Sequence, residues 1–424
     1  MLKRGKMEKK SVKDVWIIGG GVIGLACAHY LSDAGIQVGV MDRGNVGQGA
    51  SHGNCGLLYF SDILPLCSPG AVGDELKRFI KGTSPLYIKP DLDVKKYVWL
   101  LNFAKKCNAT HQKEAAKNKY DILMYSMELS KTLLSSTSLN CDFEDVGTLK
   151  VFAEEKTFLD HARTQDFLSG FGLQAEKIEA NRLAELEPAL LDGLAGAWLN
   201  KADWHLRPDL LMASWHKWLK KKGVVFHENC AVEDLRIANN RIEAVHTNRG
   251  TFQADEVILA AGAWTPRITQ KLGLGLPVIP GKGYSITMER PGLCPTYPCM
   301  LYEKNMVVTP WQSAYRLGGT MEFSGYSDSL NPKRLVKLLQ GAKAYMKEPI
   351  GTPLIEEWSG LRPMTYDDMP LIDRVGRLKN MIVATGHGML GVTLAAATGK
   401  AVCDMILGRP TEIDMTPYSS KRFA

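Results

Sequence analysis

Three glycines near the start of the chain have the spacing that binds a dinucleotide. Gly19, Gly21 and Gly24 form GxGxxG directly after an apolar run, and Asp42 closes the next apolar run. In such a unit the first glycine permits a tight turn, the second lets the backbone approach a pyrophosphate, and the third lets the helix lie close to the strand. A carboxylate at Asp42 would accept hydrogen bonds from ribose hydroxyls. The alternative is a glycine-rich turn that binds nothing.

A second glycine-rich segment, GHGMLGVT at 386–393, follows an apolar run near the end of the chain. Backbone N–H groups at the start of a helix there would stabilise negative charge on a bound group. The alternative is a strand-to-helix turn in which the glycines serve geometry alone.

Arg362 lies in the apolar phrase WSGLRP, where an arginine without a partner would be costly. We expect it to meet an anion or a carboxylate, to which a guanidinium donates two parallel hydrogen bonds. The alternative is a structural salt bridge to a nearby aspartate, namely Asp367, Asp368 or Asp373. Tyr284 and His387 are second candidates for contact with a ligand, and a packed structural role suits each equally. Arg316 is either another anion contact or a residue on the solvent face of a strand.

Apolar periodicity predicts the elements that position these residues. Val15–Ile18 and Ile36–Met41 are expected to be parallel strands, joined by a helix that runs to about Ala34 and stops at Gly35. Further strands are expected at 224–226, 257–261 and 381–384, and helices at 120–134, 208–222 and 392–407. Alternation in YSITM, MVVTP and YRLGGTMEF predicts antiparallel strands that line a site.

Length and composition limit the class of protein. A chain of 424 residues, 45% hydrophobic and 23% charged, has room for two domains and little for disorder. Lys plus Arg exceeds Asp plus Glu by 52 − 45 = 7 without a long basic block, which disfavours nucleic-acid binding. The basic start before VWIIGGGVIG imitates a signal peptide, but glycines interrupt its apolar part and a second strand follows. No apolar run reaches the length of a transmembrane helix.

The nine cysteines and nine histidines include no CxxC or HExxH pattern. We therefore expect no metal and no disulfide framework, and we also expect no nucleophilic residue. Cysteines without a disulfide pattern suit the cytoplasm, or the inner face of the cell membrane.

The motifs together resemble one known family along nearly the whole chain. They are GGGVIGLACAHYL, GQGASHGNCGL, PLCSPG, ILAAGAWT, PGKGYSIT, LGGTMEF, WSGLRPMTYDDMPLI and ATGHGMLGVTLAAATGKAV. This set resembles the glycine and D-amino-acid oxidase family of FAD-dependent flavoproteins, and within it the bacterial D-amino-acid dehydrogenases.

The resemblance implies an α/β fold, with a Rossmann-like FAD-binding domain and a second, substrate domain built on an antiparallel sheet. We assign residues 14–66, 205–270 and 370–424 to the FAD-binding domain, and 67–204 and 271–369 to the substrate domain. An NAD-linked dehydrogenase, the different-class alternative, would share the first motif but not the later ones.

The resemblance also assigns the cofactor site. It places the ADP half of FAD at Gly19, Gly21, Gly24, Asp42 and Arg43, and the pyrophosphate and flavin near Ser51, His52 and Asn54. It places the adenine near Val232, adds Gly262, and sets the pyrimidine end of the ring at Gly386, Gly388, Gly391, Val392 and Thr393. We expect a noncovalent contact from His52 rather than a covalent bond to the flavin.

The implied activity is the oxidative deamination of a D-amino acid to a 2-oxo acid and ammonia, by hydride transfer from Cα to the flavin N5. Arg362 would hold the substrate carboxylate, with Tyr284 and His387 nearby. Alternative substrates are D-proline or hydroxyproline, glycine, and N-methyl amino acids of the sarcosine type. The electron acceptor would be oxygen or a quinone, with a possible peripheral contact to the membrane.

Overall fold

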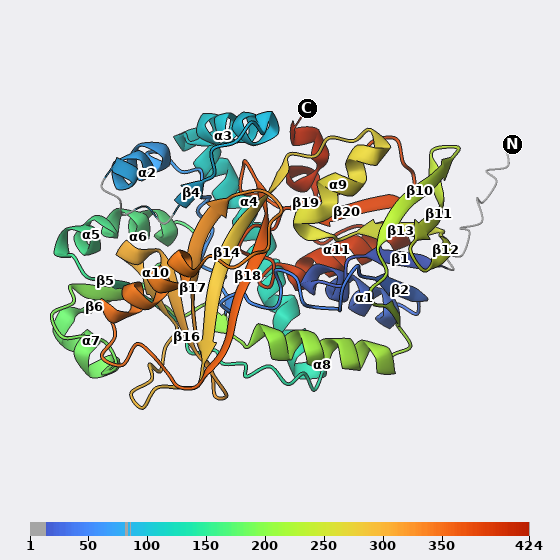
Figure 1. Cartoon of the computed structure of the whole chain (residues 1–424). Coiled ribbons are helices and arrows are strands. Elements are labelled where there is room, and N and C mark those ends of the chain that lie inside the picture. Colours follow the sequence, from blue (N-terminus) through green and yellow to red (C-terminus); the bar gives the residue numbers. More distant parts are fainter. Residues whose placement is uncertain (1–13, 81–83, 85, 424) are drawn as a thin grey trace, which may run out of the picture.

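The first of two main sheets carries the dinucleotide motif (Figure 1). The computed structural model describes residues 14–80, 84 and 86–423. Six strands lie in the order β19-β20-β13-β1-β2-β9, and every neighbouring pair is parallel except β19 with β20. They are β1 (Val15–Ile18), β2 (Val38–Met41), β9 (Val225–His227), β13 (Glu256–Leu259), β19 (Leu371–Arg374) and β20 (Met381–Thr385). The parallel strands predicted from the apolar runs are confirmed.

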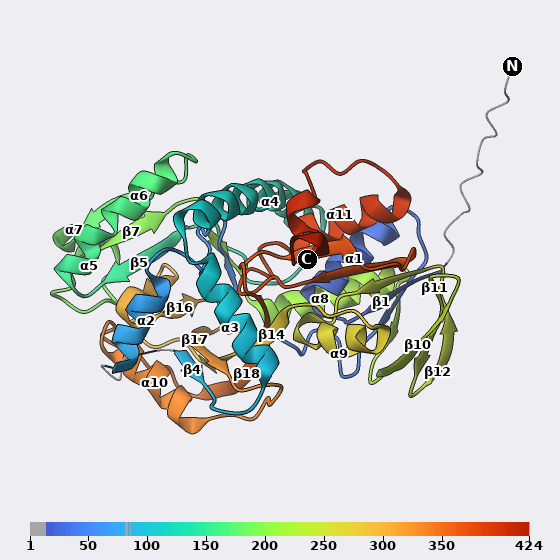
Figure 2. The same cartoon turned by 90° about the horizontal axis from the view of Figure 1, so that it is seen from above.

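Helices cover one face of this sheet, and a small meander covers the other (Figures 1 and 2). The helical side holds α1 (Val22–Asp33), α4 (Ala109–Ser136), α8 (Pro208–Lys221) and α11 (Ala395–Leu407). The other side holds β10 (Val232–Ala238), β11 (Arg241–Thr247), β12 (Gly250–Gln253) and α9 (Thr265–Thr269). Ile17 packs into the helical side and Ile18 into the meander side, which explains why β1 is apolar without alternation.

The second sheet has nine strands and is mostly antiparallel. Eight lie in the order β18-β14-β17-β16-β15-β5-β7-β6, and β4 pairs with β17. The pairs β15 with β5 and β17 with β4 are parallel, so the sheet is mixed. The strands are β4 (Leu86–Ile88), β5 (Thr148–Phe152), β6 (Glu176–Glu179), β7 (Gly196–Asn200), β14 (Val278–Met288), β15 (Cys299–Leu301), β16 (Met306–Pro310), β17 (Tyr315–Phe323) and β18 (Leu354–Thr365).

The remaining α-helices are α2 (Ala71–Ile80), α3 (Val94–Lys106), α5 (Glu155–Asp160), α6 (Ala162–Ser169), α7 (Ala180–Leu186) and α10 (Pro332–Lys343). Those that lie around the second sheet include α5, α6, α7 and α10 (Figure 2). The strands β3 (Leu57–Leu58) and β8 (Trp204–His205) pair with each other. The short 3-10 helices are η1 (Gly262–Trp264), η2 (Gln270–Leu272), η3 (Tyr302–Lys304), η4 (Thr416–Tyr418) and η5 (Ser420–Phe423).

The strands of the first sheet all come from the three segments assigned to the FAD-binding domain, and those of the second sheet from the two substrate-domain segments. The exact boundaries stay a prediction. Helix α4 belongs by sequence to the substrate-domain segment 67–204, but it packs against α11 of the FAD-binding domain.

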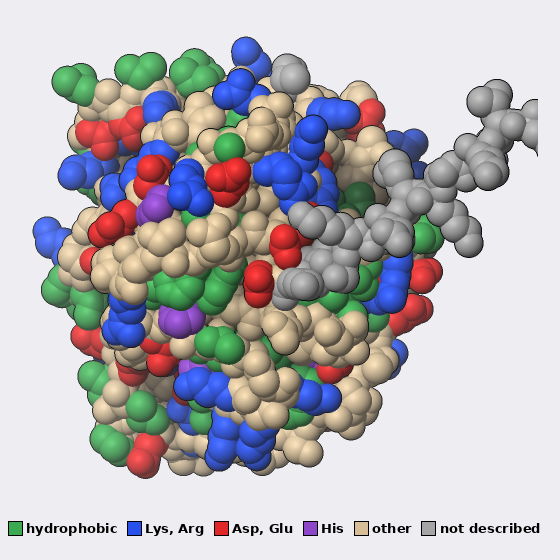
Figure 3. Space-filling model, turned by 90° about the vertical axis from the view of Figure 1, so that its right-hand side faces the viewer, with side chains coloured by type: hydrophobic (Ala, Val, Ile, Leu, Met, Phe, Trp, Pro, Cys, Tyr) green, Lys and Arg blue, Asp and Glu red, His purple; other side chains and the backbone are tan. Residues whose placement is uncertain are grey.

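The helix expected at 392–407 begins three residues later, at Ala395, because turns occupy 391–394. Within the ranges described, none of the helices is both long and apolar enough to cross a bilayer. On the face in Figure 3, Lys and Arg side chains are mixed with Asp and Glu, as expected of a chain without a long basic block.

Candidate active site

One cavity of about 1480 Å³ joins the two sheets. It runs from the glycine turn after β1, past the loop at 48–57, to Arg362 on β18 and the loop at 387–392. Cavities for drug-sized ligands span roughly 300–1000 Å³. The volume here therefore has room for an extended dinucleotide together with a small substrate.

The glycine turn has the geometry that its motif predicts. Gly19 has φ +111°, and a Cβ there would stand within 3.0 Å of the Ala260 carbonyl oxygen. A Cβ on Gly24 would stand within 3.0 Å of the Gly19 carbonyl oxygen, so only glycine lets α1 approach β1 this closely. At the start of α1, the Val22 N–H donates to Ser51 Oγ at 2.9 Å. The turn thus presents a helix N-terminus to the cavity, which suits a pyrophosphate.

Asp42 lines the cavity next to this turn. Its Oδ2 accepts from the Gly20 N–H at 2.7 Å, and its Oδ1 accepts from the Gly44 N–H at 2.9 Å. The guanidinium of Arg43 lies over the Trp264 ring, 3.4 Å from its centroid, and burial lowers the pKa of Arg43. Val232 and Gly262 also line the cavity, so the structure brings these predicted cofactor residues together.

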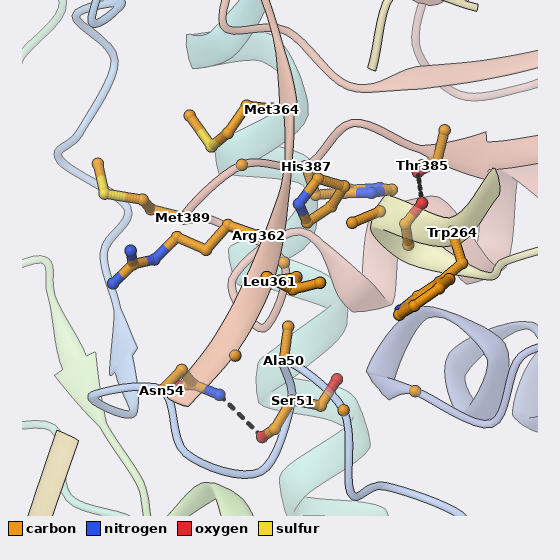
Figure 4. A pocket seen from close by; sticks show the side chains of 18 of the residues that line it. Ala50, Ser51, Asn54, Trp264, Leu361, Arg362, Met364, Thr385, His387 and Met389 are labelled. Carbon is orange, nitrogen blue, oxygen red and sulfur yellow. Dashed lines mark hydrogen bonds between the residues drawn. The ribbon is translucent and has the colours of Figure 1, made fainter. Parts of the chain in front are cut away.

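An internal network holds the loop that approaches the flavin position. Asn54 Nδ2 donates to the Ser51 carbonyl at 2.9 Å, and Asn54 Oδ1 accepts from the Gly56 N–H at 2.8 Å (Figure 4). Arg316 Nη1 donates to the carbonyls of His52 and Asn54, at 3.1 and 2.8 Å. Because Arg316 is 1% exposed, the alternative that it lies on the solvent face of a strand was wrong. Sequence alone did not indicate that it fixes this loop.

The side chain of His52 points away from the cavity. Its Nε2 lies 2.9 Å from Glu356 Oε1, and its ring faces Trp358 at 6.5 Å between centroids. Among the described residues that line the cavity, Ser51, Gly53 and Asn54 are present and His52 is not. A direct flavin contact through the His52 ring therefore stays a prediction without geometric support.

The loop at 386–393 divides into lining and supporting residues. Gly388, Gly391 and Val392 line the cavity, whereas Gly386 and Thr393 do not. Gly386 has φ +75°, and a Cβ there would stand 2.7 Å from Thr365 Cγ2. Thr393 Oγ1 accepts from the Tyr59 N–H at 3.1 Å. Gly386 and Thr393 therefore support the conformation of the loop through packing and a hydrogen bond, without lining the cavity.

His387 is buried beside the same cavity. Its Nε2 lies 2.9 Å from Thr398 Oγ1, and burial lowers the pKa of His387 to about 3. The ring is therefore neutral near pH 7 and is a poor general acid there.

Arg362 extends from β18 into the cavity beside Met389 (Figure 4). Its guanidinium occupies the space that a Cβ on Gly283 would fill, and Nη1 donates to the Thr320 carbonyl at 3.0 Å. Thr320 has φ +64°, an unusual backbone for threonine that aims this carbonyl. Burial lowers the pKa of Arg362.

No described carboxylate forms an ion pair with Arg362, and the alternative of a salt bridge to a nearby aspartate was wrong. Asp367 pairs with Arg422 at 2.6 Å, Asp368 pairs with Lys119 at 3.1 Å, and Asp373 accepts from Ser419 and Ser420 at 2.7 Å each. A cavity-lining guanidinium without an acid partner is suited to a ligand carboxylate.

Tyr284 is 2% exposed, and its hydroxyl donates to Glu322 Oε2 at 3.1 Å. Successive residues of a strand point to opposite faces, and its neighbour Gly283 is the one that faces Arg362. The structure therefore does not bring the Tyr284 hydroxyl to Arg362, although Tyr284 contributes to the cavity wall.

The fold and the site together define a dinucleotide-binding protein, with a Rossmann-like sheet, a glycine turn at a helix N-terminus, and an arginine without an acidic partner among the described residues at the far end of one cavity. The model of the DAO family, described as FAD dependent oxidoreductase, matches residues 14–405. The chain belongs to this family of FAD-dependent oxidoreductases. FAD, not NAD, is the cofactor that this family uses, and the cavity fits it.

Relatives agree with this assignment. A D-amino acid dehydrogenase of Neisseria meningitidis is 32% identical over 96% of this chain and 99% of its own length. A D-amino acid dehydrogenase of Helicobacter pylori is 31% identical over 93% of this chain and 94% of its own length. The glycine oxidase structure from Geobacillus kaustophilus has a TM-score of 0.78 and 23% identity, covering 96% of this chain and 97% of that one, and shows the shared fold. The protein is therefore an FAD-dependent oxidoreductase.

Proposed function

We propose that the protein oxidises a D-amino acid to the corresponding 2-oxo acid and ammonia. The observation that carries the proposal is Arg362, which lines the cavity and has no acidic partner among the described residues. The relatives named D-amino acid dehydrogenase, which cover nearly the whole chain, support the D configuration.

In this proposal Arg362 holds the substrate carboxylate through two parallel hydrogen bonds, and the Thr320 carbonyl fixes the guanidinium. Bound FAD supplies the acceptor for the two electrons and the hydrogen that Cα loses. His387 stays neutral and so adds no charge beside the substrate amine. Water then hydrolyses the imino acid, and this sequence needs no acid–base pair.

The residues proposed to hold FAD lie along the same cavity. The N-terminus of α1, with Gly19 and Gly21, would take the pyrophosphate, and Asp42 would take the ribose hydroxyls. Backbone N–H groups at 388–392 would face the pyrimidine end of the ring and stabilise its negative charge.

Anaerobic bleaching of the flavin should identify the substrate class. Purified protein, mixed without oxygen, is expected to bleach with D-amino acids and not with their L enantiomers. D-proline, hydroxyproline, glycine and sarcosine test the alternative substrates, and bleaching by these alone would contradict the proposal. The speed at which air or an added quinone restores the yellow colour then separates the two proposed acceptors.

Denaturation should release the flavin into solution. His52 Nε2 is bound to Glu356 and the ring does not line the cavity, so the residue first considered for a covalent bond is turned away from the flavin position. After acid precipitation we expect the yellow colour in the supernatant. Colour that stays with the pellet would show a covalent link. Free FAD mixed with an unrelated precipitated protein is the control for trapping.

We also propose a peripheral contact with an anionic membrane surface, through α3 and the turn before it. Val94, Val98 and Leu101 follow one another at helical spacing and are 71%, 50% and 63% exposed, and Leu92 is 97% exposed. Lys89, Lys95 and Lys105 are exposed around this apolar stripe. Apolar side chains flanked by lysines suit the interface of a bilayer that contains acidic lipids.

Vesicle sedimentation tests this contact. The double variant Leu92→Ser with Val98→Ser should bind vesicles of phosphatidylglycerol and phosphatidylethanolamine at least about ten-fold more weakly than the parent protein, because two apolar side chains lose their burial. Val336 is 48% exposed and lies on α10, outside the proposed membrane-contact surface, so Val336→Ser serves as the matched control. Equal binding by all three proteins, or none by the parent, would contradict the proposal.

A further inference from the structure

The cavity continues beyond the space next to Arg362 and extends along the second sheet, from strand to strand, toward β5. One row of paired residues marks its path: Gly318 pairs with Val307, Val307 with Met300, and Met300 with Lys150. All four line the cavity. Neighbouring strands lie about 4.8 Å apart, so three steps place Lys150 roughly 14 Å from Gly318.

Two opposite charges face this far end. Lys150 comes from β5, and Asp62 comes from the turn after β3, where its N–H donates to the Tyr59 carbonyl at 3.3 Å. Both are half-buried and line the cavity. Each acts electrostatically on the other, but within the described part of the chain neither side chain takes part in a hydrogen bond or ion pair.

The charged side chains of Asp203 and Lys119 nearby, by contrast, already have hydrogen-bond or ion-pair partners within the protein. Asp203 is fully buried and accepts from the N–H and the Oγ of Ser61, at 2.9 Å each. Lys119 pairs with Asp368 at 3.1 Å. Burial lowers the pKa of Lys150 and raises the pKa of Asp62, so both have lost water without gaining a bonded partner. Charges left in this state are costly unless a ligand or ordered water meets them.

We propose that Lys150 and Asp62 form a subsite for the polar end of the substrate side chain, and that a carboxamide fits it best. This inference rests on the proposed function, since Arg362 must hold the carboxylate at the other end. A carboxamide oxygen accepts from the Lys150 ammonium while its NH₂ group donates to the Asp62 carboxylate. A carboxylate or an ammonium in its place would pair with one of these charges and repel the other.

The span agrees with a side chain of glutamine length. The Arg362 guanidinium bonds to a carbonyl of β17, three strands from β5, and the lysine side chain can reach back by about 6 Å. The gap between the two cationic groups is then roughly 8 to 14 Å. A glutamine molecule spans about 12 Å when a hydrogen bond of about 2.9 Å is added at each end.

Equilibrium binding of two acids that cannot be deaminated tests the subsite. They are 4-carbamoylbutanoate and 4-(methylsulfanyl)butanoate, which are glutamine and methionine without the amino group. Titrated into the FAD-loaded protein and followed by the flavin absorbance, the carboxamide should bind at least about ten-fold more tightly than the thioether. Lys150→Met and Asp62→Asn should each reduce this preference to less than about three-fold and leave thioether affinity unchanged.

Lys201→Met is the matched control, because this lysine pairs with Glu176 on the surface with 71% of its side chain exposed. It should keep the full preference. Equal affinity for both acids in the parent protein, which needs no variant, would overturn the subsite, as would a preference that survives both substitutions. If neither acid bound the parent protein, this would instead contradict the carboxylate role of Arg362 and with it the proposed function.

Discussion

Replacing Arg362 with Met is expected to lower kcat/KM for the preferred amino acid by roughly 30- to 5000-fold, the equivalent of about 2 to 5 kcal/mol of lost transition-state binding. The guanidinium lines the cavity, bonds to the Thr320 carbonyl and has no acidic partner among the described residues, so a substrate carboxylate is the anion that it would meet. Steady-state rates with an artificial electron acceptor, across substrate concentrations, measure the effect.

Three comparisons make this result interpretable. Arg362→Lys keeps the charge but loses the two parallel bonds, and we expect an intermediate loss. Arg236→Met removes an arginine whose side chain is 52% exposed on β10, and it should retain parental kinetics. FAD content should be unchanged in all three variants, because Arg362 stands at the substrate end of the cavity. Unchanged kcat/KM in Arg362→Met would remove the carboxylate role.

The first βαβ unit was predictable because its constraints are local. Gly19, Gly24 and Asp42 act within one strand-helix-strand segment, where spacing alone specifies the turn, the close packing and the carboxylate. The antiparallel strands of the second sheet were also predictable, since alternation is a local signal. The parallel pairing of β5 with β15 joins segments about 150 residues apart and left no such signal.

The surroundings of Arg362 depended on distant residues and could not be predicted. The three aspartates nearest in sequence are engaged by Lys119, Arg422 and the serines 419 and 420, which other segments bring to them. Only the fold shows that they are occupied. From sequence spacing, the salt bridge to one of these aspartates therefore stayed open as the alternative to an arginine that meets a ligand.

Tyr284 shows a different limit. Nearly every residue of β14 is buried, so the strand has no polar face to indicate which side chains point to the cavity. The sequence made Tyr284 a second candidate for contact with the substrate, whereas the alternation of the strand turns its hydroxyl toward Glu322. The role of Arg316 in holding the loop at 52–54 and the place of Lys150 in the cavity were not predicted, because both depend on residues from other strands and loops.

Replacing Gly24 with Ala is expected to remove FAD binding and to destabilise the protein by about 3 kcal/mol. The new Cβ would stand within 3.0 Å of the Gly19 carbonyl oxygen, and that oxygen belongs to backbone that cannot turn aside. Helix α1 would have to move away from β1, which displaces the helix N-terminus from the pyrophosphate position. Fluorescence titration of apoprotein with FAD should show affinity at least about a hundred-fold weaker.

Gly275→Ala is the matched control, because a Cβ there meets no atom within 4 Å and its φ is not in the left-handed region. This variant should bind FAD and unfold like the parent protein. Thermal unfolding of the Gly24→Ala and parent proteins, both without FAD, separates a packing defect from the loss of cofactor. A lower unfolding temperature for Gly24→Ala would show that the new Cβ forces the helix off the strand even when no FAD is present. Parental FAD affinity together with a parental unfolding temperature would mean that the packing of α1 on β1 does not form the cofactor site, and the assignment of the glycine turn would fail.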